Sequence, residues 1–181
     1  MTTWKIDPAH SEVSFKVKHM VISTVVGSFK NFDASIYTNK EDFSDAAIKF
    51  EADINSINTK NEQRDTHLKS ADFFDAENHP KMIFESTSVK KISGFELQVK
   101  GNLTLRGVTK EVTLDVIYNG TVSGFGGSEI AGFEVRGKVN RFDYGLQWNA
   151  ITEAGGVVVS NEVKIKILAE FNKAQKATKA A

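Results

Sequence analysis

Apolar and polar side chains alternate with a period of two through most of this 181-residue chain. Successive side chains of a β-strand point to opposite faces, so the alternation is typical of strands with one face in the core and one in water. The clearest alternating segments are EVSFKVKHM (12–20), AAIKFEADINSI (46–57), FELQVKGNLTL (95–105), EVTLDVIY (111–118), GFEVRGKVNRF (132–142) and NEVKIKILAEF (161–171). The sequence therefore predicts an all-β fold.

Two further segments, GSFKNFDASIY (27–37) and MIFESTSVKK (82–91), alternate less regularly and bring the number of expected strands to about eight. A bulge near Lys30 would place Phe29 and Phe32 on the same side of the first of them. Antiparallel strands in this number form a sandwich or a barrel. The barrel is favoured because a closed sheet leaves no unpaired edge.

The alternation also assigns the side chains that face inward. They include Val13, Phe15, Val17, Ile48, Phe50, Ala52, Phe95, Leu97, Val99, Leu103, Leu105, Val112, Leu114, Val116, Tyr118, Phe133, Val135, Val139, Val163, Ile165, Ile167, Ala169 and Phe171. Thirteen phenylalanines are unusual for this length and indicate a large aromatic interior. Gly101 and Gly137 also face inward and either make room for bulky neighbours or leave volume for a ligand. Gly107 can adopt the positive φ of a tight hairpin.

Composition limits the classes of function. Lysine and arginine balance aspartate and glutamate at 23 each, so nucleic acid is not an expected partner. The length suits one domain, expected over residues 1–172, followed by a polar, disordered tail over residues 173–181. No apolar run reaches the roughly 20 residues of a membrane-spanning helix. The N-terminus lacks a leader pattern, which favours the cytoplasm, or the periplasm if a leader has been removed.

One segment, residues 59–76, interrupts the alternation with helix chemistry. Thr59 and Glu62 match a capping box, and Ser70 is a second possible helix start, with Asp72 in its first turn. The apolar residues of this insert are expected to dock it on the barrel; they are Leu68, Phe73 and Phe74. We therefore predict a short helical insert that could plug or open one end of the barrel.

The insert and its neighbourhood also contain groups capable of chemistry. The candidate metal ligands are Asp65, His67, Asp72, Asp75 and His79. Their spacing matches no ligand motif, and carboxylates beside short helices routinely serve as caps, so no metal, cofactor or catalytic residue is predicted. His10 and Ser11 are adjacent in sequence and would point to opposite faces of a strand, which excludes a base–nucleophile pair.

Two polar residues stand in apolar registers. His19 continues the inward series of its strand, and Arg141 continues the series that ends at Val139. Either residue could emerge at the rim of the barrel, where it meets water. A buried guanidinium would need partners for its donors, which could be a carboxylate such as Asp143 or an anionic group of a ligand.

Five ordered motifs resemble those of one known family. They are IDPAHSEVSFKVKHM, VGSFKNFDASI, RDTHLKSADFFDAENHPKMIFEST, VKGNLTLRGVTKEVTL and GKVNRFDYGL. From Trp4 to about Phe171 the chain resembles the YceI-like proteins, which are lipocalin-like barrels that bind polyisoprenoids and related long-chain lipids. The resemblance implies an extended, antiparallel, eight-stranded lipocalin-like barrel with a long hydrophobic tunnel. It also implies a homodimer and no catalysis.

Together these observations predict non-enzymatic binding, transport or storage of a long-chain lipid. The resemblance leaves polyprenyl phosphate or pyrophosphate, quinone and fatty acyl amide open as ligands. The expected lining residues are Phe15, Val17, Phe29, Phe32, Phe50, Phe84, Leu103, Phe133 and Val139. The expected head-group contacts are Arg141, His19, Arg64 and His67. Two alternatives are a small lipid-processing or stress-response enzyme that uses the segment His67 to His79, and a filled barrel that serves as an interaction module.

Overall fold

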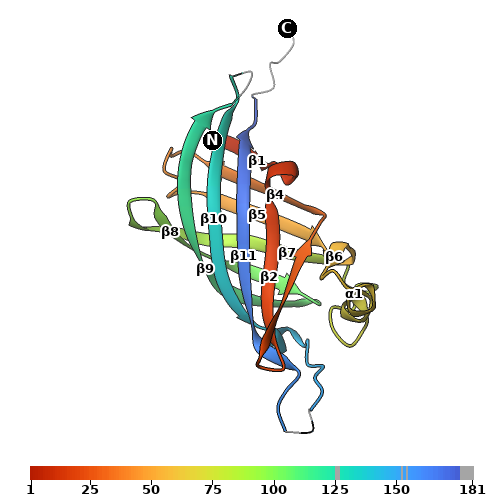
Figure 1. The fold of residues 1–181 in the computed structure, drawn as a ribbon. Coiled ribbons are helices and arrows are strands. Elements are labelled where there is room, and N and C mark those ends of the chain that lie inside the picture. The colour runs from red at the N-terminus through yellow and green to blue at the C-terminus, as the bar shows by residue number, and fades with distance from the viewer. Residues whose placement is uncertain (125–126, 152, 154, 176–181) are drawn as a thin grey trace.

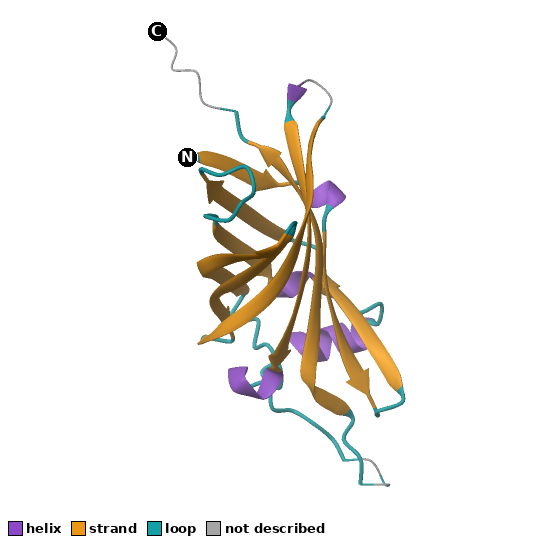
Figure 2. Ribbon diagram, turned by 90° about the vertical axis from the view of Figure 1, so that its left-hand side faces the viewer, coloured by secondary structure: helices purple, strands orange, loops and turns teal. Residues whose placement is uncertain are grey.

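The computed structural model describes residues 1–124, 127–151, 153 and 155–175. Most of this chain is strand, and its helical segments are short and confined to connections (Figure 2). The strands are β1 (Thr2–Ile6), β2 (Glu12–His19), β3 (Ser23–Phe29), β4 (Phe32–Thr38), β5 (Ala47–Asp53), β6 (Ile57–Asn58), β7 (Lys81–Ser93), β8 (Glu96–Leu105), β9 (Val108–Ser123), β10 (Glu129–Asn140) and β11 (Val159–Lys173). The helical segments are α1 (Glu62–Lys69) and the 3-10 turns η1 (Pro8–His10), η2 (Ile54–Ser56) and η4 (Arg141–Tyr144).

The strands form a closed antiparallel barrel (Figure 1). Each strand pairs with the next in the order β1-β4-β5-β7-β8-β9-β10-β11, and β11 pairs with β1 to complete the ring of eight. β2 continues β1 along β11, and β3 pairs with β2 as β4 pairs with β1. The eight-stranded barrel predicted from the alternation is confirmed, with the strand halves β1/β2 and β3/β4 separated by bends.

Two local predictions about strands are wrong. The segment 27–37 is not one bulged strand: Phe29 ends β3 and Phe32 begins β4, and the two strand segments have different neighbours. Phe95 does not face inward; it is 66% exposed, because it follows Gly94 in the turn before β8 begins. The hairpin at Gly107 is confirmed, since Gly107 has φ +72° between paired β8 and β9.

The helical insert is confirmed, but its caps differ from those expected. α1 begins at Glu62 with Asn61 as N-cap, whose side-chain oxygen accepts from the Arg64 N–H at 2.9 Å. Thr59 instead donates its N–H and hydroxyl to Asp65, at 2.9 and 2.6 Å. Ser70 is the C-cap of α1, and residues 71–74 form a turn, not a second helix.

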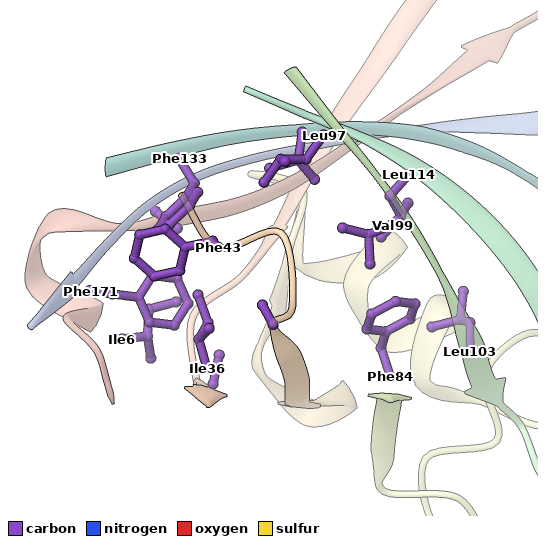
Figure 3. Packing of buried hydrophobic residues seen from close by; sticks show 14 of the residues in the cluster. Ile6, Ile36, Phe43, Phe84, Leu97, Val99, Leu103, Leu114, Phe133 and Phe171 are labelled. Atoms are coloured by element: carbon purple, nitrogen blue, oxygen red, sulfur yellow. The ribbon is translucent and has the colours of Figure 1, made fainter. Parts of the chain in front are cut away.

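One end of the barrel is filled by Phe43, from the loop between β4 and β5 (Figure 3). This side chain is 2% exposed, and its ring centre lies 5.4 Å from that of Trp4 and 5.0 Å from those of Tyr118 and Phe133. Its φ of +58° is uncommon for a residue with a side chain. Asp45 holds the loop by accepting from Thr38 and from neighbouring backbone N–H groups. The loop thus acts as a fixed plug.

The last strand reaches further than the expected domain boundary. β11 runs to Lys173, which pairs with Trp4, and the N–H of Ala174 donates to the carbonyl of Thr3 at 2.8 Å. The sheet therefore extends into the first residue of the stretch expected to be a disordered tail. The remainder of that prediction, for residues 176–181, lies outside the described part of the chain.

Candidate functional site: the barrel cavity

The barrel encloses a cavity of about 230 Å³. Its wall consists of the inward faces of the strands, completed by side chains from the connections, which are Phe43, Ala46, Leu68, Phe73, Phe74 and Leu146. Among the described lining residues, only Ser14 and Arg141 are polar or charged. Ser14 donates its hydroxyl to the carbonyl of Lys166 at 2.9 Å. The inner surface is thus a continuous apolar wall with one cationic group.

The structure places most of the predicted lining residues on this wall. Those that line the cavity are Phe15, Val17, Phe29, Phe50, Phe84, Leu103, Phe133 and Val139. Phe32 does not line it and packs instead between the two clusters of buried apolar residues. At Gly101 and Gly137, an added Cβ would collide with Phe84 and Leu114 respectively. These two glycines therefore make room for neighbouring side chains, the first of the two roles considered for them.

Access to the inner face changes along the barrel. Along β11 the inner side chains are half-buried from Val159 to Ile167 and buried at Phe171. Along β2, Val17 is half-buried and Val13 is buried. The inner face is therefore filled at the Phe43 end and accessible toward the opposite end, which carries the β2–β3 turn and the loop after β10 (Figure 1).

Arg141 lies at the accessible end and is itself 4% exposed. Its guanidinium donates to four backbone carbonyls, those of Leu146 (2.6 Å), Trp148 (2.7 Å), Ser160 (3.0 Å) and Val159 (3.2 Å). Among the described residues it has no salt-bridge partner, so Asp143, given as an example of one of the two kinds of partner considered, does not pair with it. Burial lowers the pKa of Arg141, yet an arginine stays protonated in proteins. The cavity wall thus carries a positive charge that is balanced by carbonyl dipoles and by the face of the Phe142 ring, whose centre lies 4.7 Å from the guanidinium carbon.

The other three head-group candidates lie off the cavity wall. His19 ends β2, and its carbonyl accepts from the Ser23 hydroxyl at 3.1 Å. Arg64 donates to the hydroxyl and to the carbonyl of Thr59, at 2.7 and 2.8 Å. His67 lies 2.9 Å from Asp72, and its ring meets Trp148 edge-on at 4.8 Å between centres. The structure therefore does not bring these three side chains together with Arg141 on the cavity wall.

Two residues that the sequence pattern did not single out hold the segment after α1 in place. Arg106, in the β8–β9 hairpin, donates to the carbonyls of Ala71, Phe73 and Gly145, at 2.8, 3.0 and 2.9 Å. Trp148 packs on Phe73 with ring centres 5.3 Å apart. Arg106 carried one signal, because it precedes Gly107 in a predicted hairpin; Trp148 carried none, because its loop has no alternation.

The candidate metal ligands form separate pairs. His67 lies against Asp72, and His79 lies 4.0 Å from Asp75. Asp65 accepts hydrogen bonds from the N–H and the hydroxyl of Thr59 within the insert. Within the described ranges, no three histidine, aspartate or glutamate side chains are grouped to hold a metal ion.

Tyr144, at the end of η4, is buried, and among the described residues its hydroxyl has no hydrogen-bond partner. Burial, with a smaller effect of the Asp143 charge, raises the pKa of Tyr144 from 10.0 to about 12. The unfolded chain loses this proton at a lower pH than the folded chain does. Stability is therefore unaffected by this group below pH 10 and falls as the pH rises from about 10 toward 12.

Replacing Tyr144 with phenylalanine is expected to remove this alkaline loss. At pH 7 the variant should unfold with an equal free energy or one higher by about 1 kcal/mol, because no hydrogen bond is lost. Toward pH 12 the free energy of unfolding of the variant should exceed that of the unchanged protein by about 2–3 kcal/mol. Urea unfolding at several pH values measures both effects. Tyr37→Phe, which keeps Tyr144, should lose stability like the unchanged protein; a similar loss in Tyr144→Phe would refute the assignment.

Among the described residues, no helix has both the length and the apolar character required to cross a membrane.

Comparison with known proteins gives matches over nearly the whole chain. The family model described as YceI-like domain matches residues 4–171. A UPF0312 protein of Staphylococcus aureus is 43% identical over 175 residues, covering 95% of this chain and 98% of the relative. The crystal structure of a Campylobacter jejuni YCEI protein is 31% identical with a TM-score of 0.76, covering 87% of this chain and 90% of that one.

Two more distant structures share the fold. Burkholderia cenocepacia BcnA superimposes with a TM-score of 0.80 at 22% identity, covering 91% of this chain and 98% of that one. A polyisoprenoid binding domain from Saccharophagus degradans has a TM-score of 0.65 at 16% identity, covering 94% and 98%. From the match over residues 4–171 and the 43% identity with the staphylococcal relative, the chain belongs to the YceI-like family.

Proposed function

We propose that this protein binds one long-chain lipid of isoprenoid type in the barrel cavity and transports or stores it unchanged. The observation that carries the proposal is the continuous apolar wall with a single buried cation, Arg141. The proposal agrees with the description of the Saccharophagus degradans neighbour, which shares the fold, as a polyisoprenoid binding domain.

The energetics favour a long chain over a short one. Burial contributes about 0.8 kcal/mol per CH₂, so about ten carbons gain roughly 8 kcal/mol and about twenty gain roughly 16 kcal/mol. Association costs about 4–15 kcal/mol in lost freedom. At the upper end of this cost, a ten-carbon chain has no net gain and a twenty-carbon chain has a small one, so the affinity should rise with the length of chain that the barrel covers.

Arg141 favours a head group that accepts hydrogen bonds. An arginine has five N–H donors, and four hydrogen bonds to carbonyls are formed here. The remaining donor and the full positive charge suit a phosphate oxygen or the carbonyl of a quinone or fatty acyl amide. These are the polyprenyl phosphate or pyrophosphate, quinone and acyl amide classes that the family resemblance leaves open.

A non-enzymatic role agrees with the chemistry of the wall. Among the described residues that line the cavity, no histidine, carboxylate or cysteine is available as a base or nucleophile. His67 and His79, on which the enzymatic alternative depends, belong to separate pairs outside the cavity. We therefore prefer carriage of the lipid, by a homodimer as the family resemblance implies, to its conversion.

Organic extraction of the purified protein, followed by mass spectrometry, tests this function. After incubation with a mixture of polyprenyl phosphate, quinone and fatty acyl amide, we expect one lipid per chain, recovered chemically unchanged. Conversion of the lipid, abolished by His67→Ala with His79→Ala, would support the enzyme instead. Recovery of empty protein from every incubation would contradict lipid binding.

A further inference from the structure

Two loops at the accessible end of the barrel expose large apolar side chains to solvent. The β2–β3 turn carries Met20, Val21 and Ile22, which are 44%, 73% and 86% exposed. In the loop before β11, Ile151 and Val157 are 80% and 48% exposed. We call these five residues the apolar tip.

The two loops of the apolar tip lie side by side. The N–H of Met20 donates to the carbonyl of Val158 at 2.9 Å, and His19 pairs with Val159 across β2 and β11. Ile151 forms an antiparallel bridge with Val157. Both loops extend from the same end of the barrel (Figure 1). The five side chains therefore form one local surface and not scattered exposed residues.

The backbone of the β2–β3 turn is held in an uncommon conformation. Met20 has φ +51° and Val21 has φ +65°. A positive φ is a clear outlier for a β-branched residue, and glycine or asparagine would adopt it at lower cost. Strained backbone of this kind clusters at functional sites. Here it accompanies the presentation of Val21 and Ile22 to solvent.

Lysines lie beside the apolar tip on the outer surface of the sheet. Lys138, Lys164 and Lys16 are direct cross-strand neighbours on β10, β11 and β2. Lys18 lies on β2 as well, two residues before Met20. We call these four residues the basic stripe. Lys138 lies 3.3 Å from Glu162. Over the described residues, the other three lysines have no carboxylate within 4.0 Å.

This arrangement of lysines is unfavourable for the isolated protein, because like charges directly opposite each other in a sheet destabilise it. An anionic surface would relieve the repulsion. A second copy of the same surface would increase it, since two basic stripes would meet. The connection between β10 and β11 carries the carboxylates Asp143 and Glu153, and Glu162 at the start of β11 already pairs with Lys138.

We propose that the apolar tip and the basic stripe dock the protein on an anionic lipid bilayer. Apolar side chains at the tip would enter the boundary between head groups and acyl chains, and the lysines would meet the anionic head groups. At about 3.3 Å per residue, Lys18 and Lys16 lie roughly 7 and 13 Å from Met20 along β2. Docking would place the accessible end of the cavity against the bilayer. The proposal goes beyond lipid binding, because it concerns the outer surface.

Vesicle co-sedimentation tests the docking. The probes are vesicles of equal parts phosphatidylserine and phosphatidylcholine, and vesicles of phosphatidylcholine alone. We expect the unchanged protein to bind the anionic vesicles, with binding that weakens as salt is added. Changing Lys16, Lys18 and Lys164 to glutamine should weaken binding about fivefold for each lysine. Changing Val21→Asn with Ile22→Ser, which also relieves the turn, should weaken it about tenfold or more.

The control is Ile92→Ser with Phe95→Ser, which removes two exposed apolar side chains from the β7–β8 hairpin, one near the end of β7 and one in the turn. It should bind the anionic vesicles like the unchanged protein. Absence of binding by the unchanged protein, or equal binding by the tip variant, would overturn the proposal. The proposal would also be overturned if the unchanged protein did not bind vesicles and the tip variant had a lower mass than the unchanged protein in light scattering. That result would identify the apolar tip as a contact between two copies of the chain. Lipid titration of the same variants without vesicles reports separately on the cavity.

Discussion

Replacing Arg141 with methionine is expected to lower the free energy of unfolding by about 3–5 kcal/mol. The guanidinium is 4% exposed and donates to four carbonyls, from Leu146, Trp148, Val159 and Ser160. Methionine occupies similar volume but donates to none of them, so these carbonyls lose their partner. The same bonds connect the loop after β10 to the start of β11, and that loop should become less protected from hydrogen exchange.

The matched control is Arg136→Met on β10. Arg136 is an exposed arginine paired with Glu134, at 2.6 Å. Exposed pairs contribute little, so this change should alter stability by less than about 1 kcal/mol. Urea unfolding of both variants measures the difference. If Arg141→Met were as stable as Arg136→Met, Arg141 would not hold this end of the barrel together.

Replacing Phe43 with alanine is expected to cost about 3–5 kcal/mol, the range for a phenylalanine removed from a core. The ring fills the closed end between Trp4, Tyr118 and Phe133, with no strand of its own to hold it. The vacated volume should open the closed end of the cavity to water.

Phe95→Ala is the control for this change, because Phe95 also lies outside the strands but is 66% exposed. Its stability should stay within about 0.5 kcal/mol of the unchanged protein. Thermal and urea unfolding measure both variants. Equal stability of the two would show that the loop of Phe43 does not act as a plug.

Most of the barrel could be predicted from the sequence, because apolar and polar side chains that alternate with a period of two indicate a β-strand with one buried face. Val13, Phe15 and Val17 share a face in any strand, and the structure places them on one wall of the cavity. The period fails where a strand ends, as at Phe95, whose place in the pattern is right but whose backbone belongs to a turn. It also fails at Phe29 and Phe32, where the chain bends between two strands.

The helix caps show a second limit. Thr59 and Glu62 satisfy the capping-box pattern, yet Asn61 caps α1, because Thr59 is drawn into hydrogen bonds with Asp65 and Arg64. Several residues near a helix start can cap it, and sequence spacing does not decide among them. The choice here depends on burial of the Thr59–Asp65 pair.

At the cavity, Arg141 was identified by its register, but its partners could not be. They are backbone carbonyls of a loop and of β11, and a carbonyl carries no sequence signal. Phe43 and Trp148 were missed for a related reason, because each reaches its place from an irregular segment. Such side chains are positioned by contacts distant in sequence, not by a local period.

Calorimetric titration of two tryptophan variants with a polyprenyl phosphate tests the proposed cavity most directly. Val112 lines the cavity, and its neighbour Thr113 is exposed on the outer face of β9. We expect Thr113→Trp to bind the lipid like the unchanged protein and Val112→Trp to bind at least about tenfold more weakly, a difference of about 1.4 kcal/mol. Thermal unfolding confirms that both variants remain folded. Equal affinities for the two variants, or no binding by the unchanged protein, would contradict lipid binding inside the barrel.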